Sequence, residues 1–160
     1  MLPLILAPNP ILRGQAAAIA LPVSHDVRTL AQEMIVAMGH YHGIGLAAPQ
    51  VNVSQRLIVI STSGHASAFI NPEIIKNSWH KVTQEEGCLS IPGVFGMVRR
   101  PQSVLARYVD LTGTTQEHWL RGILARVYQH EVDHLNGVLF TDRTNKLTAG
   151  RDLLATYGLS

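Results

Sequence analysis

Apolar side chains recur at helical spacing between residues 26 and 41. They would form one buried stripe on a helix, and they are Val27, Leu30, Met34, Ile35 and Met38. Ser24 stands just ahead of this segment, where a serine oxygen can accept a hydrogen bond from a free amide of the first helical turn. The pattern predicts an amphipathic helix from about residue 26 to residue 41.

After Gly43 the pattern changes to the short apolar and β-branched runs that are typical of strands. The runs cover residues 56–61, 69–77, 103–111 and 114–119. Asp110-Leu-Thr-Gly113 lies between the last two runs and has the composition of a tight turn. We therefore expect the last two strands to form a hairpin.

A second helix is predicted over residues 120–136. This segment has no proline, carries apolar residues at Ile123, Leu124, Val127 and Leu135, and is followed by Gly137, a common helix terminator. A short helix is also predicted over residues 151–157. The predicted order is a helix, several strands and a helix, without regular alternation, which indicates an α+β fold instead of a doubly wound sheet. The length of 160 residues suits a single domain, residues 1–160.

Composition narrows the function classes. Lysine and arginine number 13 against 11 aspartates and glutamates, a net charge of +2 that gives no reason to expect DNA binding. The single cysteine excludes an internal disulfide framework and fits a reducing compartment. The apolar amino terminus lacks a basic segment and holds three prolines in ten residues, so we expect an ordered arm, with neither a secretion signal nor a membrane span. We expect a monomeric protein of the cytoplasm.

The sequence His130-Glu-Val-Asp-His134 carries the strongest chemical signal. Residues four apart on a helix project from the same face, so His130 and His134 can share one metal ion. Glu131 is close enough to handle a proton of water, and Cys88, the only cysteine, offers a thiolate. Cys88, His130 and His134 would leave a fourth coordination position open, which is typical of a catalytic metal site.

The histidines and the cysteine could also have purely structural roles. A lone histidine is usually a surface or satisfied core residue, and a lone cysteine usually packs as a small apolar residue. The predicted helix around His130 and His134 favours the metal site. Two alternative functions stay open: a zinc peptidase, whose third ligand commonly lies downstream, and a non-catalytic peptide-binding protein, which predicts loss of Glu131 or of a ligand.

Three segments resemble the signature motifs of the peptide deformylase family. They are GIGLAAPQ at residues 43–50, EGCLS at residues 86–90 and QHEVDHL at residues 129–135, in the family's order. The resemblance runs from about Pro8 to Phe140 and implies antiparallel sheets packed around a carboxyl-terminal metal-binding helix, with an amino-terminal helix. It also implies hydrolysis of the formyl group of N-formylmethionine at the start of nascent polypeptides, with release of formate.

The resemblance implies roles for particular residues. Cys88, His130 and His134 would hold the metal, and Glu131 would transfer protons. The Gln50 side chain and the Leu89 backbone N–H would stabilise the oxyanion, although without the motif Gln50 would be taken for a solvated loop residue. Residues expected to bind the peptide are Gly43, Ile44, Gly45, Gly87, Ile123 and Val127.

Several neighbouring features affect specificity. Many bacterial family members carry a glutamate and an arginine where this chain has His42 and Phe95, so its substrate preference can differ. We expect the Arg126 guanidinium to stay in water at the rim of the pocket. The Arg99-Arg100 pair is interpreted as solvated, with an ion pair to Glu86 or Asp133 as the alternative.

Thiolate and imidazole ligands suit iron, zinc and nickel alike, and the resemblance implies Fe²⁺, with Zn²⁺ or Ni²⁺ as alternatives. Some family members dock on the ribosome through a longer basic terminal helix. The tail of this chain holds Arg143, Lys146 and Arg151 against Asp152, which is too few cations for strong RNA binding. We expect no more than transient ribosome proximity, and a tail beyond Thr144 that the enzyme can lose.

Overall fold

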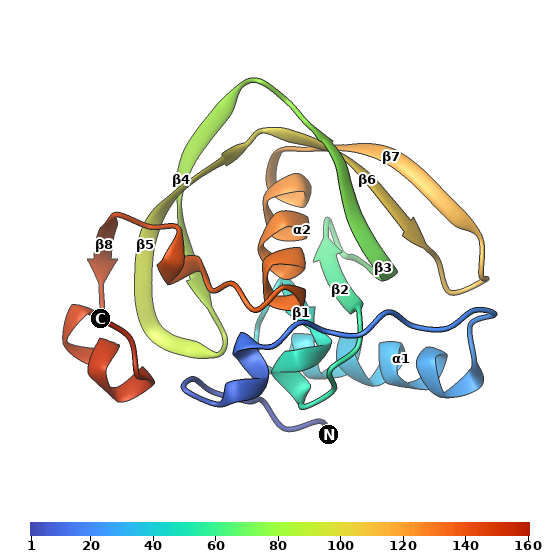
Figure 1. Cartoon of the computed structure of the whole chain (residues 1–160), viewed down its shortest axis with the longest axis horizontal. Coiled ribbons are helices and arrows are strands. Elements are labelled where there is room, and N and C mark those ends of the chain that lie inside the picture. The colour runs from blue at the N-terminus through green and yellow to red at the C-terminus, as the bar shows by residue number, and fades with distance from the viewer.

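Two antiparallel sheets curve around the central helix α2 in the computed structural model, which describes residues 1–160 (Figure 1). The five-stranded sheet has the order β1-β2-β3-β6-β7, with bounds Gly45–Ala47, Leu57–Thr62, His65–Asn77, Ser103–Val109 and Thr115–Arg121. The three-stranded sheet has the order β4-β5-β8, with bounds Lys81–Cys88, Ile91–Pro101 and Lys146–Ala149. The α+β prediction is confirmed.

Helix α1 (His25–His40) lies within one residue of its predicted bounds. The Ser24 side chain accepts a hydrogen bond from the Val27 N–H at 3.2 Å, which confirms the predicted cap. Val27, Met34 and Met38 are buried, and the predicted stripe packs against one face of the five-stranded sheet. The helix is thus held by its apolar face.

The β6–β7 hairpin is confirmed as well. Its turn is stabilised by the Asp110 carboxylate, which accepts hydrogen bonds from the N–H groups of Thr112 and Thr114 at 2.9 and 3.0 Å. Gly113 has φ +89°, a backbone conformation that glycine adopts without strain. The tight turn brings β7 back along β6 in full antiparallel register.

Strand β2 explains how the five-stranded sheet is buried. Leu57 and Val59 belong to the core under α1, whereas Ile58 and Ile60 belong to the core under α2. Successive side chains of a strand point to opposite faces, so a strand covered on both faces is apolar throughout. The sheet lies between the two helices.

Helix α2 (Gly122–Leu135) is shorter than predicted at its start, because residues 120 and 121 still belong to β7. Gly137 takes the left-handed conformation, φ +72°, just beyond the helix, as expected of a terminator. Most of the helix is buried, since the five-stranded sheet covers one side and the three-stranded sheet the other. None of the helices combines the length and the apolar character that crossing a membrane requires.

The three-stranded sheet is absent from our sequence predictions. Most side chains of β4 are exposed and polar, and β5 contains glycines and prolines that obscure a strand pattern. The two strands nevertheless pair from Lys81 with Pro101 to Gly87 with Phe95. Their hairpin tip carries Cys88, so the missed sheet is the one that positions a candidate ligand.

Both chain ends are built into the domain. The amino-terminal arm donates hydrogen bonds from Ile5 N–H to the Gln50 carbonyl at 2.8 Å and from Ala7 N–H to the Ser90 carbonyl at 2.9 Å. At the other end, β8 pairs with β5, and the predicted short helix is a 3-10 helix, η4 (Arg151–Tyr157). The expectation of a dispensable tail disagrees with this packing, because the tail supplies a strand and part of an apolar cluster.

Candidate active site

The three candidate metal ligands come together although they lie on different elements. Cys88 ends β4, and His130 and His134 lie one turn apart on α2. Their Sγ and ring nitrogen atoms all lie within 4.8 Å of one another, with Cys88 Sγ 3.2 Å from His134 Nε2. One sulfur and two imidazoles at this spacing are a donor set for a divalent transition metal.

His130 is oriented by Glu86, two residues before Cys88. Its Nδ1 lies 3.0 Å from Glu86 Oε2, so Nε2 is the nitrogen left to face Cys88 and His134. A carboxylate partner of this kind fixes the tautomer and ring orientation of a metal-binding histidine. Glu86 is therefore the partner that sequence alone could not assign, although its place in the motif around Cys88 was a cue.

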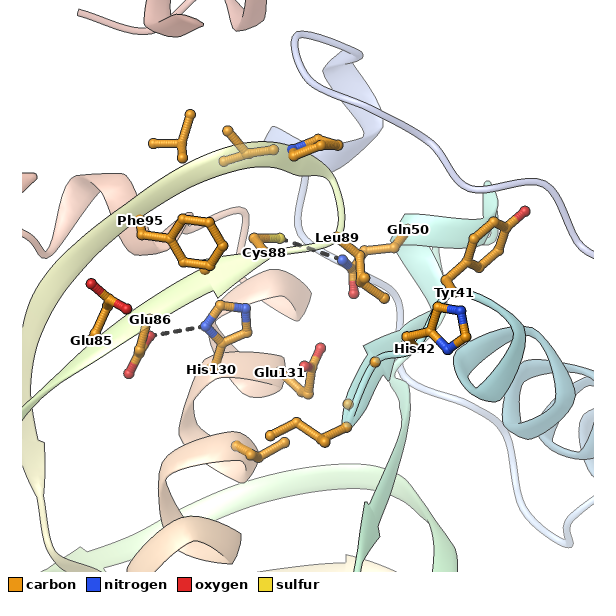
Figure 2. Close-up of a pocket in the computed structure, with 18 of the residues that line it drawn as sticks. Tyr41, His42, Gln50, Glu85, Glu86, Cys88, Leu89, Phe95, His130 and Glu131 are labelled. Carbon is orange, nitrogen blue, oxygen red and sulfur yellow. Dashed lines mark hydrogen bonds and ion pairs between the residues drawn. The ribbon is translucent and has the colours of Figure 1, made fainter. Parts of the chain in front are cut away.

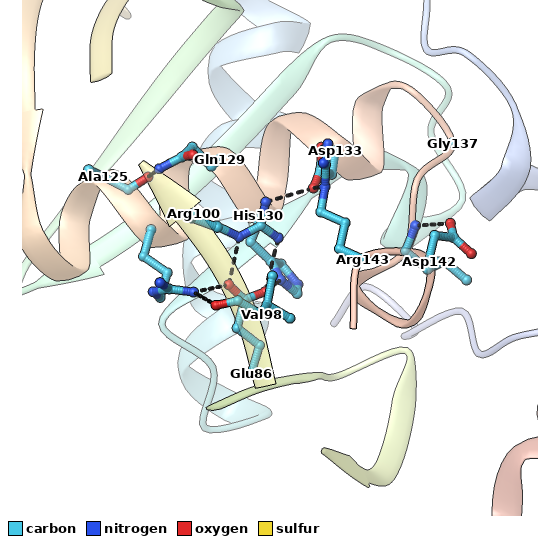
Figure 3. A network of polar contacts seen from close by, with 12 residues as sticks. Glu86, Val98, Arg100, Ala125, Gln129, His130, Asp133, Gly137, Asp142 and Arg143 are labelled. Atoms are coloured by element: carbon cyan, nitrogen blue, oxygen red, sulfur yellow. Dashed lines mark hydrogen bonds and ion pairs between the residues drawn. The ribbon is translucent and has the colours of Figure 1, made fainter. Parts of the chain in front are cut away.

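Glu86 belongs to a buried network of charges beneath the ligands (Figure 3). Arg100 donates to both Glu86 oxygens, at 2.6 and 2.9 Å, and to Asp133 at 2.9 Å. Asp133 also accepts two hydrogen bonds from Arg143, at 2.5 and 2.6 Å. Burial alone would raise the pKa of Glu86, but the hydrogen bonds from His130 and Arg100 hold it well below its usual range.

Two sequence interpretations are corrected by this network. Arg126 is only 7% exposed, and its guanidinium donates to Glu86 at 2.7 Å and to the Val98 carbonyl at 3.0 Å, so it does not stay in water. Arg100 is buried and ion-paired, whereas Arg99 is exposed as expected. An arginine can be buried when its five donors meet carboxylates and carbonyls, and these partners are distant in sequence.

Glu131 faces the cavity from α2 without taking part in the ligand cluster (Figure 2). Its Oε2 is buried and has no hydrogen-bond partner in the protein. Burial raises the pKa of Glu131 to about 7, near the value at which a carboxyl group can both accept and donate a proton at neutral pH. A nearby cation would lower this pKa again, because positive charge favours the carboxylate.

Gly45 has a specific reason to be glycine. A Cβ at this position would collide with the Glu131 carboxylate and would lie 2.6 Å from Val127 Cγ1. The backbone of β1 can approach the carboxylate only because that side chain is missing. At the start of the same segment, the Gly43 N–H bonds to the Met38 carbonyl, so Gly43 closes α1 and also lies on the cavity.

Gln50 is buried, at 2% exposure, in the 3-10 helix η2 (Ala48–Val51), and is not a solvated loop residue. Its Oε1 accepts from the Ala47 N–H, and its Nε2 donates to Ser90 Oγ at 3.1 Å, with Cys88 Sγ at 3.6 Å. The Leu89 N–H makes no hydrogen bond within the protein. Two N–H donors thus flank the candidate ligand Cys88.

A cavity of about 630 Å³ opens beside these groups. It is lined by every residue to which a catalytic, peptide-binding or ligand role was assigned, except His134, which is 1% exposed beneath it. Those lining residues are Gly43, Ile44, Gly45, Gln50, Gly87, Cys88, Leu89, Ile123, Val127, His130 and Glu131. The structure brings the predicted set together, and their individual roles stay predictions.

Two sheet edges meet at the cavity. β1 is an edge strand of the five-stranded sheet and β4 is an edge strand of the three-stranded sheet. Residues 43–45 and 85–88 line the cavity from these edges. An extended peptide between them could use backbone hydrogen bonds on either side.

The site fits a divalent metal ion on its own chemistry. The sulfur and the two imidazoles converge within coordination reach of a common centre, and Glu86 leaves one nitrogen of His130 for the metal. The unpaired Glu131 oxygen stands beside this centre and is available for the proton of a water molecule. Cys88, His130 and His134 are therefore the residues that would hold the ion.

Known proteins are similar to this chain in both sequence and fold. A profile of the polypeptide deformylase family matches residues 1–149. The peptide deformylase of Rhizobium meliloti is 42% identical over 150 residues, which cover 91% of this chain and 86% of that protein. Fold and sequence agree over nearly the whole length.

Solved structures agree as well. The Synechococcus elongatus peptide deformylase in complex with actinonin superposes with a TM-score of 0.90 at 38% identity, covering 99% of this chain and 87% of that one. A class I type b peptide deformylase from Acinetobacter baumannii, with Met-Ala-Ser bound, gives 0.86 at 37% identity, covering 89% and 98%. With the motifs, the fold and the converging ligands on one cavity, the chain belongs to the peptide deformylase family.

Proposed function

We propose that the cavity between β1, β4 and α2 is the catalytic centre of a peptide deformylase. The reaction of the family is the metal-dependent hydrolysis of the formyl group from the amino terminus of nascent peptides. The observation that carries the proposal is the convergence of Cys88, His130 and His134 beside the unpaired carboxylate oxygen of Glu131. Residues 1–160 would act as one catalytic domain.

A divalent ion held by the three ligands would supply Lewis-acid activation of water and of the formyl oxygen. Glu131 accepts a proton from the attacking water and delivers it to the departing amine, a role supported by its unpaired Oε2 and its place on the cavity beside the ligands. Gln50 Nε2 and the Leu89 N–H donate hydrogen bonds to the oxygen on which negative charge develops. The C–N bond of the formamide breaks, giving formate and a free amino terminus.

The peptide would lie along the two sheet edges. Gly43, Ile44 and Gly45 would bind its backbone on one side and Gly87 on the other. Ile123 and Val127, on the cavity face of α2, would contact the side chain of the first residue. An aliphatic surface suits methionine, which is unbranched and apolar.

We propose Fe²⁺ as the native ion, with Zn²⁺ or Ni²⁺ as functional substitutes. The mixed thiolate and imidazole set suits all three ions, and zinc binds more tightly than ferrous iron to most sites of this kind. Elemental analysis of protein purified without oxygen and without added metal would decide, since zinc in place of iron would overturn the assignment. We also propose a monomeric enzyme with only transient ribosome proximity, and a cytoplasmic one, since the single free cysteine, Cys88, fits a reducing compartment.

A formate-release assay tests the function. Formyl-Met-Ala-Ser should yield formate, and unformylated Met-Ala-Ser should yield neither formate nor free methionine. Glu131→Gln is the matched variant, because it keeps all three ligands and should lower turnover by about 10²–10⁴-fold with metal content near one equivalent. Cleavage of the Met-Ala bond would indicate a metallopeptidase, and metal binding without any turnover would indicate a non-catalytic peptide-binding protein.

A further inference from the structure

The last eleven residues of the chain contact the β4–β5 hairpin on the side that faces away from the candidate active site. The family profile ends at residue 149, so residues 150–160, called here the terminal segment, lie beyond it. The segment consists largely of η4, and Figure 1 shows it beside the lower end of β5. Its sequence carries no residue expected to take part in the chemistry.

The terminal segment contacts the tip of the β4–β5 hairpin, residues 88–94. The Tyr157 hydroxyl donates a hydrogen bond to the Pro92 carbonyl at 2.9 Å. A Cβ on Gly93 would lie 2.9 Å from Leu153 Cδ1, and a Cβ on Gly150 would collide with the Gly93 carbonyl. The two segments are therefore in close contact, with backbone against backbone at the glycines.

The inner side of the same hairpin tip forms part of the cavity. Ile91, Pro92, Gly93 and Val94 line it, and Cys88 stands at the start of the tip. Leu153, Leu154 and Tyr157 pack against the apolar cluster that contains Ile91 and Val94, and Cys88 packs against it too. One side of the tip thus faces the peptide site and the other faces the terminal segment.

Residues 92–94, at the far end of the hairpin tip, have no pairing partner in β4, because they lie between the pairs Cys88–Ile91 and Gly87–Phe95. Gly93 has φ +80°, and glycine loses more conformational freedom on ordering than any other residue. The near end is fixed at Ser90, which accepts hydrogen bonds from Gln50 and from Ala7. At the far end, the terminal segment supplies the contacts: Tyr157 donates a hydrogen bond to the Pro92 carbonyl, and Leu153 packs beside Gly93.

We propose that Tyr157 and Leu153 are positioning residues, which hold residues 92–94 in the conformation that binds the peptide substrate. The terminal segment would act on substrate binding through the hairpin tip without touching the substrate. Cys88 and Leu89 lie on the end of the tip that Gln50 and the amino-terminal arm already hold. The effect of the terminal segment therefore falls on KM more than on kcat.

Tyr157→Phe, Leu153→Ala and the exposed control Thr156→Ala, each in the full chain, test this proposal. The first two should raise KM for formyl-Met-Ala-Ser by about 2- to 10-fold, the range expected for losing one hydrogen bond or contact, with kcat within about twofold of the parent. Thr156→Ala should leave both constants unchanged. Tyr157→Phe keeps the ring and its packing, so it tests the hydrogen bond even if Leu153→Ala folds poorly.

Hydrogen exchange of the peptide-free protein supplies a readout that does not need turnover. Amides of residues 89–95 should exchange faster in Tyr157→Phe and Leu153→Ala, while α1 exchanges as before. Unchanged KM and unchanged exchange in both variants would overturn the proposal, as would a loss of kcat, metal and thermal stability in parallel. The kinetic comparison rests on the proposed function, and if the parent protein released no formate, that function would fail while the exchange comparison still tested the positioning role.

Discussion

Glu86 links the candidate metal site to the charges buried beneath it. Its two oxygens receive hydrogen bonds from Arg100, Arg126 and His130, and its side chain is 6% exposed. A carboxylate buried alone would be strongly unfavourable, but the surrounding donors offset the loss of water. The same hydrogen bonds that stabilise the charge set the orientation of His130.

We predict that Glu86→Gln lowers metal affinity by about 10- to 100-fold, the usual effect of losing such a histidine partner. An amide cannot satisfy the two arginines and the imidazole together, and unpairing a buried ion pair typically costs about 3–5 kcal/mol of stability. Chelator competition and thermal unfolding would measure the two effects. Glu85→Gln is the control, since exposed Glu85 bonds only Thr148, and equal metal affinity in both variants would contradict the role of Glu86.

Phe95 gives the mouth of the cavity an apolar side. It is 41% exposed, and a Cβ on Gly87 would lie 2.6 Å from its ring. Ile44 and Ile123, also exposed, line the same cavity. A phenylalanine here cannot form an ion pair with a substrate carboxylate.

We predict that Phe95→Arg shifts preference towards formyl-methionyl peptides with an acidic second residue. A solvent-exposed ion pair contributes about 0.2–1 kcal/mol, so the ratio of kcat/KM for acidic over apolar second residues should rise by up to about fivefold at low salt. Phe95→Leu, which stays apolar, should keep the parent ratio. An unchanged ratio in Phe95→Arg would show that the second residue does not reach this side of the mouth.

The structure brings together the residues that the motifs singled out, whereas the expectation for charges with distant partners was wrong. His130, His134 and Cys88 could be picked out because few residue types bind metals. Arg100 and Arg126 were expected in water, since a charge read alone favours exposure. Their burial follows from Glu86, which lies 14 and 40 residues away and becomes a neighbour only in the fold.

At the level of elements, the sequence predicted a helix or turn correctly where one face is buried or where the capping residue lies within a few positions. The stripe of α1, its Ser24 cap and the β6–β7 turn all depend on residues close in sequence. Strands β4 and β5 did not follow such a rule. Strand β4 is mostly polar, and β5 contains glycines and prolines. The two strands are held by pairing with each other and, on the inner face, by the buried charges around Glu86.

The Asp110 turn gives a pH-dependent prediction. Hydrogen bonds from Thr112, Gln116 and Thr114 lower the pKa of Asp110 from 3.8 to about 2. A depressed pKa in the folded state means that the turn is stabilised fully above about pH 4 and progressively less as the pH falls towards 2. The ionised carboxylate therefore stabilises the native turn more than the protonated form does.

We expect Asp110→Ala to lower the melting temperature at pH 7, because the turn loses its acceptor. The difference between parent and variant should shrink between about pH 4 and pH 2, where the parent carboxylate takes up its proton. Scanning calorimetry across this range measures both curves. A difference that stayed constant with pH would mean that the carboxylate charge contributes nothing to the turn.

At the scale of the whole molecule, both sheets and one helix form the candidate active site, and both chain ends pack against it. The amino-terminal arm bonds Gln50 and Ser90, and the carboxyl-terminal residues cover the hairpin tip. No local pattern in the sequence indicates these contacts, because each joins segments more than 40 residues apart. The tail consequently could not be judged dispensable from its composition alone.

The carboxyl-terminal tail carries few unpaired cations. Arg143 is engaged with Asp133, so only Lys146 and Arg151 are left there, against Asp152. Affinity for RNA rises with the number of phosphates that cations neutralise, and two dispersed cations contribute little. Lys146→Ala combined with Arg151→Ala should therefore leave co-sedimentation with ribosomes and formate release unchanged. Point changes are preferable to truncation after Thr144, which would remove β8 and η4 and destabilise the fold. Loss of co-sedimentation in the double variant, with formate release intact, would show that these two cations dock the enzyme on the ribosome.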